Sequence, residues 1–331
     1  MNIALDAFGS DNAPAPEVEG AIRAIHEEFC DKIYLVGKKQ QLKKELKKYY
    51  FDEDTIEIIP SEQIIKSSEK PLKEVKRKKE SSLIKAIELV KDKKASAIVS
   101  AGSTGAVMAG SLLTLGRIPG ILRPALAVQL PTIKDPVVVL DVGANVDCSV
   151  KNLVQFAEMG NIYSSYLTKQ ENPKVALLNI GEEKKKGNEI TKATHEELEK
   201  NKSINFVGNI EGKDILKGEV KVIICDGFVG NIMLKTVEGV ALSLFEILKK
   251  QFNEDWVAKI GAILSYPAFK HFKKKVDYTE YGGAFLLGLN AISIIAHGRS
   301  NSKAIFNALK FASFSIKSKF LPHMKKFYKS K

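Results

Sequence analysis

Short apolar runs of strand length recur along the chain, and several are apolar at consecutive rather than alternating positions. Consecutive apolar residues are typical of strands buried on both faces, as in a parallel sheet. Helical patterns separate many of these runs, and this alternation predicts a doubly wound, three-layer α/β/α fold. The predicted strands are NIALD, KIYLVG, TIEIIP, ASAIVSAG, PVVVLDVG, KVALLNIG, INFVGN and VKVIICDG, and the predicted helices are Val18–Phe29, Gln40–Tyr49, Ser81–Lys91, Lys151–Thr168 and Glu189–Asn201.

Most of the predicted strands end in Asp, Asn or Ser beside Gly. Taken singly, each such end is an ordinary turn with a helix cap. In open α/β sheets, however, ligands bind beyond the carboxyl ends of the strands. Together these ends predict one ligand-binding crevice at a single edge of the sheet. They read LDAFGSDN, VSAGSTG, LDVGANVD, LNIGEE and CDGFVGN.

The pattern changes at residues 236–275, where helical periodicity continues without a strand signal. We predict one α/β domain over residues 1–331, with this segment as a helical excursion. An apolar stripe followed by lysines is typical of a helix on an anionic membrane, but also of a dimer interface. The sequence leaves both open. The stripe comprises Leu244, Phe245, Leu248, Phe252, Trp256, Ile260, Ile263 and Leu264, and the lysines are Lys270, Lys273, Lys274 and Lys275.

The formal net charge is +12, and residues 281–331 hold Arg299 and eight lysines but no Asp or Glu. Only five arginines occur in the whole chain, which disfavours nucleic acid as a partner, because arginine is the residue that reads base edges. A lysine-rich field fits an acidic protein or an anionic lipid surface. A generally basic, soluble surface explains it equally well.

Three features bear on the cellular compartment. Cys30, Cys148 and Cys225 are scattered without metal-ligand spacing, as expected in a reducing cytoplasm. No secretory leader pattern occurs at Met1, and no run approaches about 20 apolar residues, so we expect no membrane-spanning segment. We therefore expect a cytoplasmic protein.

The turn Ala101–Gly105 follows a predicted strand and opens a helix. Its glycines and hydroxyls at a helix start predict an anion site, with phosphate on Ser103, Thr104 and Gly105, although a self-satisfied cap would look the same. A rival interpretation is a serine hydrolase, because the order Ser103, Asp226, His297 matches the α/β-hydrolases. The spacing is one residue short of G-x-S-x-G and no HGGG-type loop occurs. No nucleotide-binding or metal-loop motif is present, so we predict no cofactor and no metal.

Ten segments, in order along essentially the whole chain, resemble the bacterial phosphate acyltransferase family. That family makes acyl phosphate from acyl-acyl-carrier-protein and inorganic phosphate for phospholipid synthesis. The resemblance implies a fold similar to isopropylmalate dehydrogenase, a homodimer, peripheral attachment to the inner face of the cell membrane, and a membrane-bound glycerol-3-phosphate acyltransferase as partner. The segments are IALDAFGSDNAP, KRKKESS, SAGSTGA, GRIPGILRPALAVQLPT, LDVGANVD, LLNIGEEKKKGNE, FVGNIEG, DGFVGNIMLKTVEG, YGGAFLLGL and AHGRSN.

Two positions depart from the motifs that this family usually carries. The first motif usually reads G-G-D, and here it is Gly9-Ser10-Asp11. Another usually reads S-A-G-N-T-G, and here Ser103 replaces the asparagine. A role that depends on an amide at position 103 is therefore in doubt, and the likeness to a hydrolase elbow looks accidental.

The implied reaction is attack of phosphate on the thioester of an acidic acyl carrier protein. It needs orientation and oxyanion stabilisation rather than a covalent nucleophile. Two other classes stay open: an acyl hydrolase or thioesterase that uses Ser103, and a non-catalytic module that binds lipid or carrier protein. We assign phosphate to Ser103, Thr104, Gly105, Lys186 and Lys235; carbonyl or oxyanion donation to Asn145, Asn188 and Asn231; thiolate protonation to His297; and orienting roles to Asp6, Asn12, Asp141 and Asp226.

Overall fold

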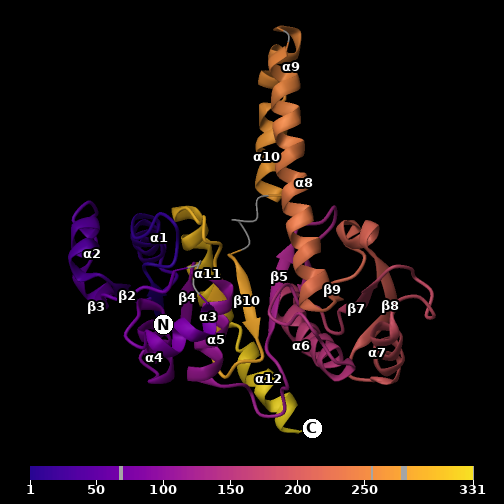
Figure 1. Ribbon diagram of the computed structural model, residues 1–331. Helices are drawn as coiled ribbons and strands as arrows, with labels where there is room; N and C mark the ends of the chain where they lie inside the picture. The colour runs from indigo at the N-terminus through magenta and orange to yellow at the C-terminus, as the bar shows by residue number, and fades with distance from the viewer. Residues whose placement is uncertain (67–69, 255, 277–281, 331) are drawn as a thin grey trace.

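An eleven-stranded mixed sheet forms the centre of the molecule (Figure 1). The structure is a computed structural model that describes residues 1–66, 70–254, 256–276 and 282–330. The strands are β1 (Asn2–Asp6), β2 (Lys32–Gly37), β3 (Ile56–Pro60), β4 (Ala97–Ser100), β5 (Ala125–Leu130), β6 (Val137–Leu140), β7 (Lys174–Asn179), β8 (Asn205–Glu211), β9 (Val222–Ile224), β10 (Ala284–Leu287) and β11 (Ile292–Ile295).

Helices cover both faces of this sheet. The α-helices are α1 (Ala15–His26), α2 (Lys39–Leu46), α3 (Pro71–Arg77), α4 (Ser82–Lys91), α5 (Thr104–Leu115), α6 (Val150–Thr168), α7 (Glu189–Lys200), α8 (Gly227–Glu254), α9 (Trp256–Leu264), α10 (Tyr266–Val276), α11 (Ser302–Lys317) and α12 (Phe320–Lys329). Short 3₁₀ turns lie at η1 (Glu53–Thr55) and η2 (Gly212–Lys217).

Each face of the sheet has its own apolar core. Ile3 and Leu5 of β1 pack in a cluster with α1, α2, α6, α7, α11 and α12. Ala4, between them in sequence, packs in a second cluster with α3, α4 and α5. Successive residues of a strand point to opposite faces, so a strand covered on both sides is apolar throughout. The predicted three-layer α/β/α fold is confirmed.

The strands do not all run in one direction, which corrects part of the prediction. The order is β3-β2-β1-β4-β11-β10-β5-β6-β9-β7-β8. β10 is antiparallel to both β11 and β5, β5 is antiparallel to β6, and the remaining pairs are parallel. β6 and β9 therefore point opposite to β1 and β4, and their carboxyl ends lie at the opposite edge. The prediction of one crevice at a single edge is wrong in that form.

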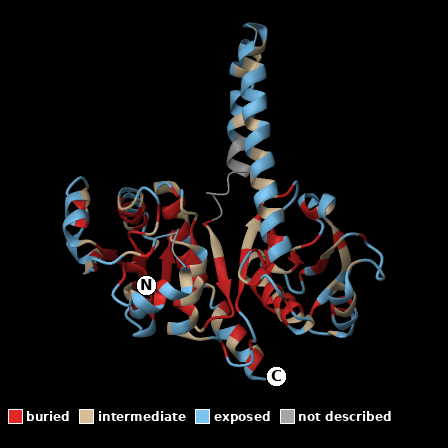
Figure 2. Cartoon of the chain, viewed as in Figure 1, coloured by how far each residue is buried: buried red, intermediate tan, exposed pale blue. Residues whose placement is uncertain are grey.

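Helices α8, α9 and α10 project from the sheet as a hairpin (Figure 1). Phe245 of α8 meets Phe272 of α10 with ring centroids 5.5 Å apart, and Phe252 meets Phe269 at 5.2 Å. Figure 2 shows that most of the hairpin is exposed, whereas buried residues concentrate in the sheet and its flanking layers. The side chains of Lys273, Lys274 and Lys275 lie outside the described residues. The extent of the predicted single domain stays a prediction.

Helix α8 also differs from a sequence-based expectation. It has 28 residues, its most apolar 18-residue window has a mean hydropathy of 1.4, and 6% of that window is buried. By length and composition alone, α8 could cross a membrane, so the expectation of no such segment does not hold on those criteria. Its first turn, however, packs with one face against the α/β body, where a Cβ on Gly230 would overlap the carbonyl oxygen of Asp141.

Two glycines of α8 provide a matched test of this packing. We expect Gly230→Ala to lower the free energy of unfolding by about 1–3 kcal/mol, because the added methyl overpacks against Asp141. Gly239 lies on the same helix, and a Cβ added there would have nothing within 4 Å. Gly239→Ala should be neutral or stabilise by up to about 1 kcal/mol through helix propensity. Urea unfolding of both variants measures the difference, and equal stabilities would contradict the packing.

Candidate functional site

The carboxylate of Asp6, at the end of β1, holds the turn that follows β4. Ser100 Oγ donates to Asp6 Oδ2 at 2.8 Å and accepts from the amide of Gly102 at 3.1 Å. The amide of Phe8 donates to Asp6 Oδ1 at 3.3 Å. Burial raises the pKa of Asp6, and hydrogen bonds from Ser82, Ser100 and Phe8 oppose that rise. The network fixes the backbone leading into α5.

Three loops pack together at this edge. A Cβ on Gly9 would lie 2.6 Å from the amide nitrogen of Gly102, so the two turns are in direct backbone contact. The amide of Asp11 donates to the carbonyl of Gly298 at 2.8 Å. We call residues 9–11, 101–105 and 297–300 the first loop cluster. Asn12 is exposed beside it.

The start of α5 opens onto this cluster. Ser103 is the N-cap residue of α5, and its side chain makes no cap hydrogen bond to the described residues. Thr104 is exposed, and Ser103 and Gly105 are half-buried. First-turn amides have no partner within a helix, and the helix dipole favours an anion at this end. The geometry suits phosphate, and the assignment of phosphate to these residues stays a prediction.

His297 follows β11 in the same cluster. Its Nδ1 accepts from the amide of Arg299 at 3.1 Å, so the neutral ring carries its hydrogen on Nε2. Burial lowers the pKa of His297, Lys235 and Arg299 lower it further, and Glu238 and Asp11 oppose them. At neutral pH the ring is therefore a hydrogen-bond donor through Nε2. Its predicted role as general acid stays a prediction and requires a proton that this setting disfavours.

The carboxylate of Asp141, at the end of β6, organises the opposite edge. Its Oδ1 accepts from the amides of Leu126 and Ala144, each at 3.0 Å. Its Oδ2 accepts from the Asn145 amide at 2.7 Å and from Asn145 Nδ2 at 2.8 Å. Asn145 Nδ2 also donates to the carbonyl of Pro124 at 2.8 Å. Both side-chain amide hydrogens of Asn145 are engaged, so its predicted oxyanion role requires this network to open.

The beginning of α8 rests on the Asp141 loop. The amide of Gly227 donates to the carbonyl of Asn145, and Asp226 Oδ1 accepts from the amide of Val229, both at 2.8 Å. Asn231 is exposed and lies beside Gly143, where a Cβ would be 3.7 Å from its carboxamide. We call residues 141–145 and 226–231 the second loop cluster. Of the two predicted amide donors in this cluster, Asn145 is buried and Asn231 is exposed.

Helix α8 connects the two clusters. Lys235 lies eight residues after Gly227, which corresponds to about 12 Å along the helix. The charges of Lys235 and Glu238 act on His297, so this part of α8 lies near the first cluster. Lys235 Nζ is 2.8 Å from Glu238 Oε2, and a phosphate would compete with that carboxylate for it. The candidate site thus runs along the first turns of α8, between strand ends from opposite edges of the sheet.

Two predicted residues lie in another loop, between β7 and α7. Asn188 caps α7 by accepting from the amide of Thr191 at 2.9 Å. Lys186 is exposed, and its carbonyl accepts from Asn179 Nδ2 at 3.0 Å. These contacts are local to the loop. The predicted phosphate role of Lys186 and the oxyanion role of Asn188 stay predictions.

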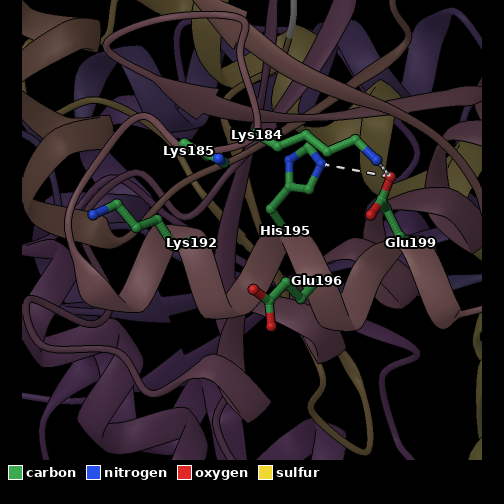
Figure 3. A pocket seen from close by; sticks show the side chains of 6 residues that line it. All are labelled: Lys184, Lys185, Lys192, His195, Glu196 and Glu199. Carbon is green, nitrogen blue, oxygen red and sulfur yellow. Dashed lines mark hydrogen bonds and ion pairs between the residues drawn. The ribbon is translucent and has the colours of Figure 1, made fainter.

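A pocket of about 500 Å³ lies beside α7, over the same loop (Figure 3). His195 Nδ1 is 2.9 Å from Asn209 Oδ1, and its Nε2 is 3.8 Å from Glu199 Oε1, which also pairs with Lys184. The lysines lie to the left of and above His195, Glu199 lies to its right, and Glu196 points away from it below (Figure 3). Its lining comprises Lys184, Lys185, Lys192, His195, Glu196 and Glu199, and includes no predicted site residue.

Sequence reasoning missed one buried acid beside the first cluster. Glu17, in the first turn of α1, is fully buried, and its Oε1 accepts from the amide of Ser10 at 3.1 Å. A glutamate at a helix start is ordinarily an exposed partner of the helix dipole. The signal that could have found it was spacing, because Glu17 shares a face of α1 with the apolar residues Ala21 and Ala24.

No group of three or more His, Cys, Asp or Glu suited to a metal ion occurs among the residues that the structure describes.

Comparison with known proteins places the chain in a family. The chain matches the family described as "Fatty acid synthesis protein" over residues 1–322. It is 50% identical over 318 residues to the phosphate acyltransferase of Dictyoglomus turgidum, covering 96% of this chain and 94% of that one. It is 50% identical over 321 residues to the phosphate acyltransferase of Clostridium botulinum, covering 97% and 96%.

The fold also has a solved counterpart. A phosphotransacetylase from Streptococcus pyogenes superposes with a TM-score of 0.64 at 16% identity, covering 96% of this chain and 94% of that one. That likeness concerns the fold, whereas the full-length identity to the curated relatives concerns the family. The chain therefore belongs to the phosphate acyltransferase family and is an acyl-transferring enzyme.

Proposed function

We propose that the enzyme transfers an acyl group from acyl-acyl-carrier-protein to inorganic phosphate, and that the acyl phosphate feeds phospholipid synthesis. The observation that carries this proposal is the uncapped start of α5 within the first loop cluster. It is a site suited to phosphate, in a chain of the phosphate acyltransferase family. The second loop cluster, across the first turns of α8, is then where the acyl carbonyl lies.

The chemistry requires little covalent help from the protein. A phosphate oxygen attacks the thioester carbon, the new C–O bond forms, the C–S bond breaks, and sulfur leaves with the electron pair and takes up a proton. Phosphate is already nucleophilic and a thiolate leaves readily, so the protein contributes orientation and oxyanion stabilisation. We assign phosphate to the α5 start with Lys235, and oxyanion donation to Asn231 and to Nε2 of neutral His297.

We also propose a location and partners. The carrier protein is acidic and this chain has a formal net charge of +12, so charge attraction favours their encounter. The exposed apolar residues of the α8–α10 hairpin support a homodimer and peripheral attachment to the anionic inner face of the cell membrane. A membrane-bound glycerol-3-phosphate acyltransferase would take the product there.

The reaction itself is tested by thiol release from acyl carrier thioester, with phosphate or with sulfate at equal ionic strength. We expect release with phosphate only, because phosphate is the nucleophile. Equal release without phosphate would instead identify a thioesterase. Binding without any release would identify a non-catalytic module.

The role of Ser103 is tested by Ser103→Ala. We expect activity to fall about 10- to 100-fold, as for loss of one positioning donor, because Ser103 holds phosphate and is not a nucleophile. The exposed Ser203 provides a matched control, and Ser203→Ala should leave the rate unchanged. An acyl group found on Ser103 by mass spectrometry would contradict the assignment.

The hairpin is tested by co-sedimentation with anionic liposomes. Trp256 is 72% exposed and Leu264 is 77% exposed. We expect Trp256→Glu and Leu264→Glu to abolish weak, salt-sensitive binding, since each nearby lysine contributes only about 1 kcal/mol. Ile133, which is 76% exposed outside the hairpin, provides the control Ile133→Glu.

Light scattering of the same variants separates the two uses of the hairpin. Loss of lipid binding with the dimer intact supports a membrane-facing tip, and loss of the dimer supports an interface. Failure of the wild-type protein to bind anionic liposomes at low salt would remove the membrane proposal.

A further inference from the structure

Glu17 is linked to the phosphate site through one short stretch of backbone. Its side chain is fully buried, and its Oε1 accepts from the amide of Ser10 at 3.1 Å. Gly9, next to Ser10, is in contact with Gly102, where a Cβ would lie 2.6 Å from the amide nitrogen. Gly102 directly precedes Ser103, the N-cap of α5. Packed backbone therefore connects the Glu17 carboxyl to the start of α5.

The electrostatic setting of Glu17 lets its charge change near neutral pH. The pKa of Glu17 is raised to about 7, mainly by burial and to a smaller extent by the charge of Asp6 on β1. Hydrogen bonds from the hydroxyl and amide of Ser10 and from the amide of Glu17 itself oppose this rise. Among the described residues, Asp6 is the charged group whose electrostatic interaction shifts the pKa of Glu17. On its other side, α1 packs against the apolar face of α11, where Gly20 abuts Ile305. The charged residues of α11 are Lys303, Lys310 and Lys317, and none of them is among the groups that shift the pKa of Glu17.

We propose that Glu17 is a positioning residue that sets the first loop cluster for phosphate through Ser10, and that ionisation of its carboxyl weakens phosphate binding there. The inference rests on the proposed function. The carbonyl oxygen of the neutral carboxyl still accepts a hydrogen bond from the Ser10 amide. The ionised carboxylate adds a buried negative charge behind a site for a phosphate dianion, and the two repel across protein of low dielectric constant.

The test compares wild type with Glu17→Gln, which keeps an acceptor for the Ser10 amide but cannot ionise. Phosphate KM and kcat are measured at pH 6, 7 and 8. The ionisation of phosphate itself is common to both proteins and cancels in their ratio. We expect the KM ratio of wild type to Glu17→Gln to rise at least about threefold from pH 6 to pH 8, with kcat within about twofold.

Two further variants give the test its controls. Glu19 is exposed on the same helix, and Glu19→Gln should keep the wild-type pH dependence. Ser10→Gly removes the hydroxyl that lowers the pKa of Glu17, so the onset of the KM rise should move to higher pH. A merely structural role for Glu17 would not move this onset.

Phosphate binding is also followed without turnover, as the rise in Tm that phosphate causes. We expect that rise to weaken between pH 6 and pH 8 in wild type relative to Glu17→Gln. A KM ratio and a relative Tm rise that do not change with pH would overturn the inference and leave the proposed function standing. Thiol release that is independent of phosphate would overturn the proposed function, while the Tm comparison would still decide the role of Glu17.

Discussion

The arrangement of the site depends on the hydrogen bonds that the carboxylate of Asp141 accepts. It lies where the sheet changes direction, and its four accepted hydrogen bonds join the amide of Leu126 on β5 to the loop at Ala144 and Asn145. The same residue's backbone meets the first turn of α8 at Gly230. Burial raises the pKa of Asp141, and the donated hydrogen bonds oppose the rise. A single residue therefore ties two antiparallel strands, a loop and a helix together.

The reversal of strand direction explains why a long helix belongs to this site. Carboxyl ends of parallel strands would meet at one edge, but β1 and β6 present theirs at opposite edges. Helix α8 starts at the second edge, and within about 12 Å its Lys235 reaches the surroundings of His297 at the first. The site is thus composite. In the proposed reaction, different halves of the sheet hold the phosphate and the acyl carbonyl, and the two meet along one helix.

The layered fold could be predicted because strands covered on both faces are apolar at consecutive residues, as Val137 to Leu140 illustrate. The direction of each strand could not be predicted, because the periodicity within a strand does not indicate which strand it pairs with. Ala125–Leu130 and Ala284–Leu287 are absent from the predicted strands, and each of them is antiparallel to both of its neighbours in the sheet. Strand-end acids such as Asp141 were visible in the sequence. The sequence did not show that the side-chain amide of Asn145 is already hydrogen-bonded, since its acceptor at Pro124 lies 21 residues away.

A buried acid beneath the proposed phosphate site would repel an anion, but its hydrogen bonds also shape that site. Asp6 accepts from Ser100 Oγ, which in turn accepts from the amide of Gly102. This chain of bonds consumes an inward-facing donor of the turn and fixes the direction of the backbone that follows. The next amides, those of Thr104 and Gly105, belong to the first turn of α5 and have no partner within the helix. Asp6 thereby holds the turn in the conformation that leaves these amides available to a ligand.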